Sequence, residues 1–322
     1  MVKGEVGGQR SRRFLPCLKK LFAGVLVAGR LKKFPQRYDA RHELARLIFP
    51  HGIPDERAAM STLNEPTLNS ALLALAQGAI QIHDLTAPLS EKTPTLVLPD
   101  PFANLIDFSI EEVSAYNEPG PFWKHHNIHT GEHIGTHIDA PVHWISGKEG
   151  KDVSQIEPHR LIGPAVVLDF NAEAAANPDF LVDVEHLVAW QEENGAFPAN
   201  AWLLFRTGWE QYDNDKQAFL NLDENGSHTP GFTVDCAKYI ADELDISGIG
   251  VETVGIDAGN AGALEPPFPM HYFLLGADKY GITSLKNLDK LPTNGAMIVV
   301  APLPVVGGTG APTRVFALVE NA

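Results

Sequence analysis

The chain has 322 residues, enough for one large domain or two small ones, and 44% of them are hydrophobic, which is ample for a core. The formal net charge of −15 is uneven: residues 1–59 hold 13 Lys and Arg against 5 Asp and Glu, whereas residues 60–322 hold 12 against 35. A domain this acidic repels nucleic acid, so we exclude nucleic acid as a partner. Cys17 and Cys236 lie far apart, which excludes a disulfide framework and favours a reducing, cytoplasmic location.

The basic segment at residues 1–59 contains a nine-residue apolar run from Leu21 to Gly29. A bilayer needs about 20 apolar residues, so we expect no membrane partner. The order of charged and apolar residues resembles a signal peptide, but no clear small-residue cleavage site follows. We predict a poorly ordered N-terminal extension over residues 1–59 and one folded domain over residues 60–322.

The first elements of that domain are a helix over residues 68–79 and a strand over residues 80–85, according to their composition. Residues 94–121 are rich in Pro, Asn and acidic side chains, and they predict an irregular loop with one short helix near residues 110–116. Phe122 and Trp123 close this loop. They are candidates for the wall of an aromatic pocket, with plain packing as the alternative.

The segment from His133 to His143 (HIGTHIDAPVH) places three histidines and an aspartate at odd positions, whereas Ile134, Ile138 and Val142 fall at even ones. This alternation is the period of a strand with one polar and one apolar face. A single histidine on a strand is more often structural than a metal ligand. Four coordinating side chains on one face, interrupted by Gly and Pro, instead predict a site for a divalent transition metal.

Geometry requires this segment to bend. In an extended strand the Cα atoms of His133 and His137 would be roughly 13 Å apart, too far to share an ion with bonds of about 2 Å. Gly135 is the expected place for the bend, because glycine adopts backbone angles closed to other residues. We therefore predict His133, His137 and Asp139 as metal ligands, with His143 approaching from the side after the chain turns.

The second half of the chain alternates predicted strands and helices. Strands are predicted over residues 165–170, 201–206, 252–257, 297–301 and 314–319, and helices over residues 183–193, over residues 209–220 and from residue 233. No repeat or low-complexity tract separates a second domain. The fold class is therefore α/β, with a single mixed-sheet domain.

Three further side chains are candidates for the site. Trp144 directly follows the motif and is expected to pack beside the metal or in the core. His271 follows the rigid proline-rich stretch at residues 266–269, which also contains Phe268. We expect His271 to contribute to the site from the second half of the chain.

The motif His133-x-Gly135-Thr136-His137-x-Asp139-x-Pro141-x-His143 resembles the signature of the metal-dependent cyclase-like hydrolase family, which includes bacterial kynurenine formamidases, isatin hydrolases and some lactone hydrolases. The resemblance also covers Ile82–Thr86, Leu203–Thr207, Gly255–Asp257, Pro302–Leu303 and Arg314–Val315. It implies a swivelling β/β/α fold for residues 60–322, which assembles as a homodimer or homotetramer.

The number of metal ions also follows from the resemblance. In the two-metal formamidases of this family, the second ion is held by the last motif histidine, a later histidine and a glutamate about twelve residues further on. His143 and His271 match the first two, but Thr283 stands at the third position, and a hydroxyl is a poor substitute for a carboxylate. The resemblance thus implies one Mn²⁺ or Zn²⁺ ion on the three motif ligands, as in isatin hydrolase-like members, and leaves both histidines as acid–base groups.

The predicted activity is hydrolysis of a C–N amide bond. A bound divalent ion lowers the pKa of water from about 15.7 to as low as about 7, and a histidine can take the proton and pass it to the leaving atom. His271 is the first candidate for this role and His143 the second, with Ser284 or Thr283 as a relay to solvent. The aromatic residues near the motif favour a flat substrate, such as an isatin-like lactam or an aryl formamide. A lactone hydrolase, a dehydratase and a non-catalytic metal-dependent binder of aromatic ligands remain alternatives.

Overall fold

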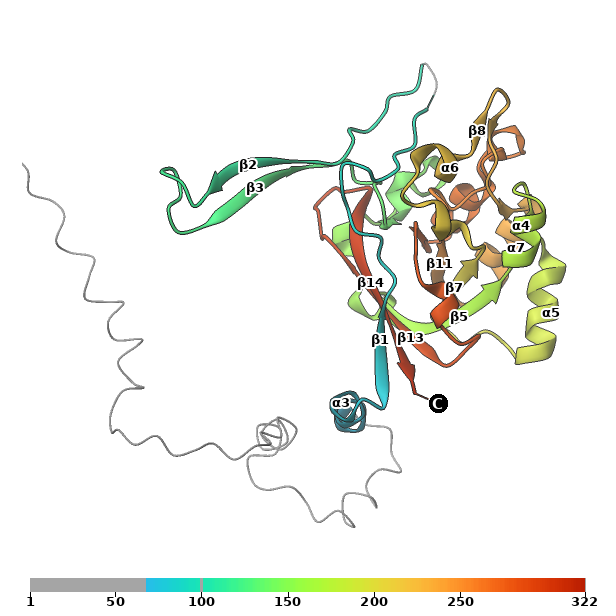
Figure 1. Ribbon diagram of the computed structural model, residues 1–322. Helices are drawn as coiled ribbons and strands as arrows, with labels where there is room; N and C mark the ends of the chain where they lie inside the picture. Colours follow the sequence, from blue (N-terminus) through green and yellow to red (C-terminus); the bar gives the residue numbers. More distant parts are fainter. Residues whose placement is uncertain (1–67, 99–100, 322) are drawn as a thin grey trace, which may run out of the picture. The chain divides into compact units, whose positions relative to one another are not determined.

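The computed structural model describes residues 68–98 and 101–321 (Figure 1). The predicted extension at residues 1–59 lies outside these described residues. Helix α3 (Leu68–Gln77) and strand β1 (Ile80–Asp84) confirm the first two predicted elements. None of the described helices is both long and apolar enough to cross a membrane.

The prediction of a short helix near residues 110–116 is wrong. These residues form strand β2 (Ser109–Ala115), which pairs antiparallel with β3 (Lys124–His129) and places Ile110 opposite Ile128. The partner strand decides the conformation, because β-branched residues are stabilised by cross-strand contacts that a local pattern does not reveal. The hairpin projects from the main sheet in Figure 1 and exposes 50% of Ile110 and 67% of Ile128.

The main sheet has eight strands in the order β1-β14-β13-β5-β7-β11-β12-β4, and an additional pairing of β4 with β14 closes it on itself. Strands β5, β7, β11 and β12 are parallel, whereas β1, β4, β13 and β14 pair antiparallel. The bounds are β4 His137–Asp139, β5 Ile162–Asp169, β7 Ala201–Arg206, β11 Ile246–Val251, β12 Tyr280–Thr283, β13 Ala296–Pro302 and β14 Gly310–Glu320. The predicted mixed-sheet α/β class is confirmed.

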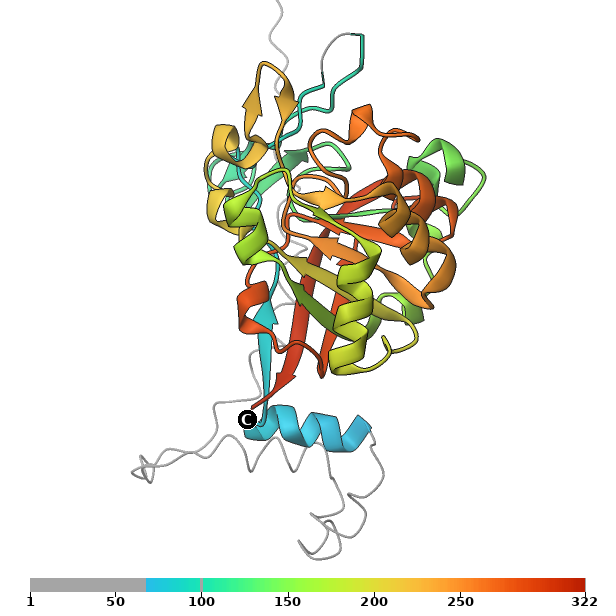
Figure 2. The ribbon, with the colours of Figure 1, turned by 90° about the vertical axis from the view of Figure 1, so that its right-hand side faces the viewer.

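The remaining helices and the two-residue strands are not part of this sheet. They are helices α4 (Asn171–Ala176), α5 (Val184–Asn194), α6 (Lys216–Leu220) and α7 (Val234–Glu243), and the two-residue strands β6 (Leu181–Val182), β8 (Leu222–Asp223), β9 (Gly226–Ser227) and β10 (Gly231–Phe232). Viewed from the side of the helices, α5 and α7 lie in front of the strands (Figure 2).

Side chains of the parallel strands alternate between two buried clusters. On β7, Trp202 and Leu204 belong to the cluster enclosed by the sheet, whereas Leu203 and Phe205 belong to the cluster beneath α5 and α7. This is the two-residue period of a strand with both faces covered. The interior of the closed sheet is therefore apolar, and the polar side chains of a functional site have room only on its outer face or at its ends.

Local signals set both ends of the helix predicted over residues 183–193. Asp183 caps α5 by accepting a hydrogen bond from the backbone N–H of His186, and Gly195, with φ of 92°, ends it. The predicted helix over residues 209–220 is instead divided into a 3₁₀ turn at Trp209–Tyr212 and helix α6. Asp215 begins α6 anew by capping it.

The strand predicted over residues 252–257 is wrong, because β11 ends at Val251. The buried carboxylate of Glu252 accepts hydrogen bonds from the backbone N–H groups of Thr207 and Trp209, at 2.7 and 3.0 Å. Burial raises the pKa of Glu252 to about 7 against the effect of these bonds. These contacts draw the chain away from the sheet, and the loop that follows carries Asp257 into the candidate site.

Candidate metal centre

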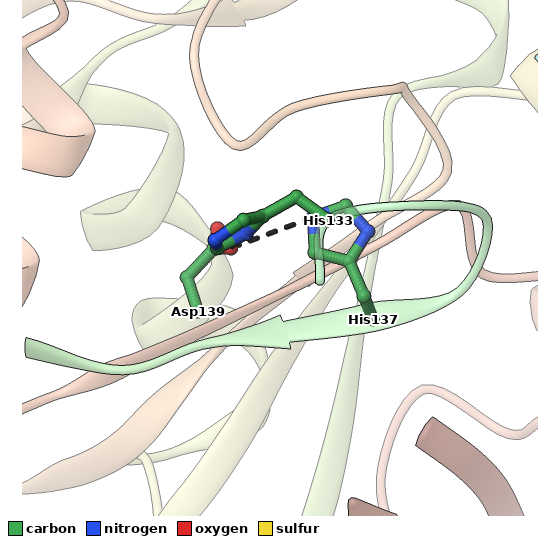
Figure 3. A group of neighbouring side chains, drawn as sticks. All are labelled: His133, His137 and Asp139. Atoms are coloured by element: carbon green, nitrogen blue, oxygen red, sulfur yellow. Dashed lines mark hydrogen bonds and ion pairs between the residues drawn. The ribbon is translucent and has the colours of Figure 1, made fainter. Parts of the chain in front are cut away.

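Strand β4 has only three residues, all buried, and it pairs with a strand on each side. Ile138 belongs to the cluster enclosed by the sheet, so His137 and Asp139 point to the outer face (Figure 3). The residues opposite Asp139 are glycines, Gly281 on β12 and Gly310 on β14. A Cβ at Gly281 would lie 3.4 Å from Asp139 Oδ2. The neighbouring strands thus leave room for the carboxylate.

The predicted bend at Gly135 is confirmed, since its φ is 62°. The bend returns the chain so that His133 meets the face of β4 (Figure 3). Its Nδ1 lies 2.7 Å from Asp139 Oδ1, and Nε2 of His137 lies 3.4 Å from the same oxygen. One ligand atom from each of these three residues lies within 4.8 Å of the others.

Hydrogen bonds turn both imidazoles toward this shared point. His137 Nδ1 lies 2.8 Å from the carbonyl oxygen of Gly135, which only accepts, so this nitrogen carries the proton and Nε2 keeps its lone pair. Thr283 Oγ1 also lies 2.9 Å from His137 Nδ1. Burial opposes the charge on Asp139, but its close contacts with the His133 and His137 rings hold its pKa well below the usual range. Two imidazoles and one carboxylate fit a divalent transition metal.

His271 reaches the same site from the second half of the chain. Its Nδ1 lies 2.6 Å from Asp257 Oδ2, and its Nε2 lies 3.9 Å from Asp139 Oδ2. The Asp257 carboxylate is itself fixed by the backbone N–H groups of Met270 and His271. Burial lowers the pKa of His271, but the hydrogen bond and charge of Asp257, together with the charge of Asp139, outweigh it and raise the pKa.

His143 lies in a 3₁₀ turn at Pro141–His143, and its ring stacks on that of His133 with 3.9 Å between centroids. The ring centroid of His271 is 5.5 Å away. Burial lowers the pKa of His143 to about 3, with the Asp139 carboxylate opposing and the neighbouring imidazoles adding to the effect. His143 is therefore a neutral imidazole near neutral pH.

The predicted aromatic residues divide into two groups. The Trp144 ring lies 4.7 Å from that of His271 and 5.7 Å from that of Phe268, so both side chains line the same cluster. In contrast, Phe122 and Trp123 lie between β2 and β3, 84% and 48% exposed. Their ring contacts join them to each other and to His125.

Ser284, the predicted relay, directly follows β12 and is buried, with a φ of 52°. Its carbonyl oxygen accepts a hydrogen bond of 2.7 Å from the hydroxyl of the motif residue Thr136. The preceding Thr283 pairs with His137 across β12 and β4. Thr283 is thus inside the site.

Sequence reasoning missed one residue whose role the geometry makes plain. Asp257 orients His271, but the pattern suggested only a strand ending there. A carboxylate following a buried run was the available signal, because loops at strand ends carry functional groups in α/β proteins.

Comparison with known proteins agrees with this geometry. The model of the Cyclase family, described as "Putative cyclase", matches residues 83–258. An isatin hydrolase from Roseibium aggregatum is 43% identical over 251 residues, 77% of this chain and 95% of that protein. A kynurenine formamidase from Salinibacter ruber is 26% identical over 191 residues, 58% of this chain and 76% of that protein. The structure of isatin hydrolase A from Ralstonia solanacearum superposes with a TM-score of 0.77, at 46% identity, over 80% of this chain and 99% of that chain.

The closed mixed sheet and its cluster of two imidazoles and a carboxylate define a metal-dependent α/β protein. With the family match over residues 83–258, the chain belongs to the Cyclase family.

The ligand assignment predicts the effect of one substitution. His137→Ala removes one of two imidazoles from the shared point, so the purified variant should contain almost no divalent metal and have no activity. His159→Ala, at an exposed position, is the matched control and should keep both. Elemental analysis checks the metal content, and a wild-type value in His137→Ala would refute the assignment.

Proposed function

We propose that this protein is a metal-dependent hydrolase that cleaves the C–N amide bond of a small aromatic or cyclic amide, either an isatin-like lactam or an aryl formamide. The observation that carries the proposal is the convergence of His133, His137 and Asp139 beside a wall formed by Trp144 and Phe268. The isatin hydrolase and kynurenine formamidase relatives support the same bond type.

The site would hold one ion, Mn²⁺ or Zn²⁺, on His133, His137 and Asp139. When bound, such an ion supplies a Lewis acid that polarises a carbonyl and lowers the pKa of a water molecule. The chain contributes an ionised carboxylate and two imidazoles already turned to the shared point. Because these side chains are largely buried, they need little rearrangement to bind the ion.

His271 is the acid–base group that the geometry favours. Asp257 holds the proton on Nδ1 and leaves Nε2 directed at the site, where it can accept a proton and return it to the leaving nitrogen. His143, with a pKa lowered to about 3, is a much weaker base, and its role is to contact the substrate as a neutral imidazole. Ser284 would relay a proton toward solvent. The Trp144 ring provides a flat apolar surface for an aromatic substrate.

The proposed substrate class is tested with matched compounds. The metal-loaded protein should hydrolyse isatin or an aryl formamide faster than the corresponding lactone, measured by the change in ultraviolet absorbance. A faster lactone reaction would instead favour a lactone hydrolase, and elimination of water would favour a dehydratase. Metal-dependent binding of aromatic ligands without turnover of any amide or ester would identify a binding protein.

His271→Ala separates chemistry from metal binding. We expect the variant to retain its metal, because His271 is outside the ligand set, and to lose rate by about 100-fold or more. Metal content and kcat are measured on the same preparation, with His159→Ala as the control. A kcat equal to that of the wild type would remove His271 from the mechanism.

We also propose that the protein is a cytoplasmic homodimer or homotetramer. A two-stranded hairpin is marginally stable alone, and β2 and β3 expose Ile110, Val113 and Ile128, which a second copy of the chain would cover. The free, buried thiol of Cys236 fits a reducing compartment.

The assembly is tested by light scattering after gel filtration. Ile128→Asp places a charge on the hairpin and should lower the molecular mass to that of a monomer. Val188→Asp, which changes an exposed residue of α5, should leave the mass unchanged. A monomeric wild-type protein would contradict this part of the proposal.

A further inference from the structure

The second ring nitrogen of His133 is part of a chain of hydrogen bonds that leads away from the site. Its Nε2 lies 2.9 Å from the hydroxyl oxygen of Thr309. That hydroxyl lies 2.6 Å from Glu132 Oε2, which also accepts the backbone N–H of Thr309 at 3.2 Å. Glu132, Thr309 and His133 thus form a continuous chain that ends at the metal cluster.

The direction of this chain follows from the chemistry of its members. An ionised carboxylate only accepts hydrogen bonds, so the Thr309 hydroxyl donates its proton to Glu132. The Thr309 oxygen is then left to accept a hydrogen bond from Nε2 of His133. Nδ1 of His133 lies 2.7 Å from Asp139 Oδ1, and an ion bound between these two atoms would use the Nδ1 lone pair while Nε2 keeps its proton on Thr309.

His133 requires such support more than the other two ligands. His137 and Asp139 belong to β4, whose pairing on both sides sets their direction. His133 precedes the bend at Gly135 and lies outside the strand. Its ring orientation therefore depends on contacts from another part of the chain.

Thr309 is well placed to supply those contacts. Its carbonyl oxygen accepts the backbone N–H of Ala140, just after β4, at 2.9 Å, while its hydroxyl holds His133. The glycines on either side permit this close approach: a Cβ at Gly310 would lie 2.5 Å from His133 Cε1, and one at Gly308 would lie 3.0 Å from Glu132 Oε1. One residue thus connects both arms of the bent motif.

We infer that Thr309 and Glu132 are positioning residues, which fix the proton position and ring orientation of His133 for metal binding. The inference rests on the metal site of the proposed function, but it is independent of the substrate. Contacts of this kind typically change metal affinity by about 10- to 100-fold.

The experiment compares Thr309→Val, which loses only the hydroxyl's hydrogen bonds, with Thr309→Ser, which keeps them. The dissociation constants of Zn²⁺ and Mn²⁺ are measured on metal-free protein by competition with a fluorescent chelator. Thr309→Val should bind about 10- to 100-fold more weakly, and Thr309→Ser should stay close to the wild type. The visible absorption spectrum of the Co²⁺-loaded protein should change in the valine variant and return in the serine variant.

Thr313→Val is the matched control, because Thr313 is a buried residue of β14, which begins directly after Thr309, and its hydroxyl has no hydrogen-bond partner among the described residues. It should leave metal affinity unchanged, and melting temperatures of the metal-free proteins report on folding. If Thr309→Val does not fold, Glu132→Gln tests the same chain and should also weaken binding.

Wild-type affinity in a folded Thr309→Val protein, or in Glu132→Gln, would overturn the inference. Equal losses in the valine and serine variants would do so too, because the hydroxyl would then not be the determinant. A protein that binds metal as described but hydrolyses no amide would contradict the proposed function and leave this inference intact.

Discussion

The site depends on the enclosure of one very short strand by two neighbours. Strand β4 is bonded to β12 on one side and to β14 on the other, so its three residues have no freedom to rotate or shift. A slip by one residue would turn His137 and Asp139 into the apolar interior and expose Ile138. The cost of burying a charge and an imidazole there would be several kcal/mol, and this penalty fixes the register.

The charges and proton positions around β4 determine what the site can bind. Asp139 is buried, yet its close contacts with the His133 and His137 rings hold its pKa well below the usual range. The Gly135 carbonyl holds a proton on Nδ1 of His137, and the Asp257 carboxylate holds one on Nδ1 of His271, so Nε2 of each ring faces Asp139. The lone pairs and the negative charge therefore face one region, which is the condition for binding a cation.

The features that sequence could predict are those encoded locally. The ligand triad and the bend at Gly135 follow from spacing and residue type within a few positions. His271 was inferred from its rigid approach, but Asp257 and Thr309 were not linked to the site, because their contacts depend on pairing between distant segments. The same reason explains the error at β2, where a strand forms because β3 lies beside it, and at residues 252–257, where Glu252 bonds to the β7 loop instead of continuing the sheet.

The closure of the sheet by β14 has a consequence for how the protein is made. Strand β4 ends at Asp139 and β14 begins at Gly310, so at ordinary rates of translation roughly 10 to 30 seconds separate the two on the ribosome. During that interval the histidines are on a segment that lacks its neighbouring strand β14 and the contact from Thr309. A chain terminated before Thr309 would carry the motif without the residues that enclose it.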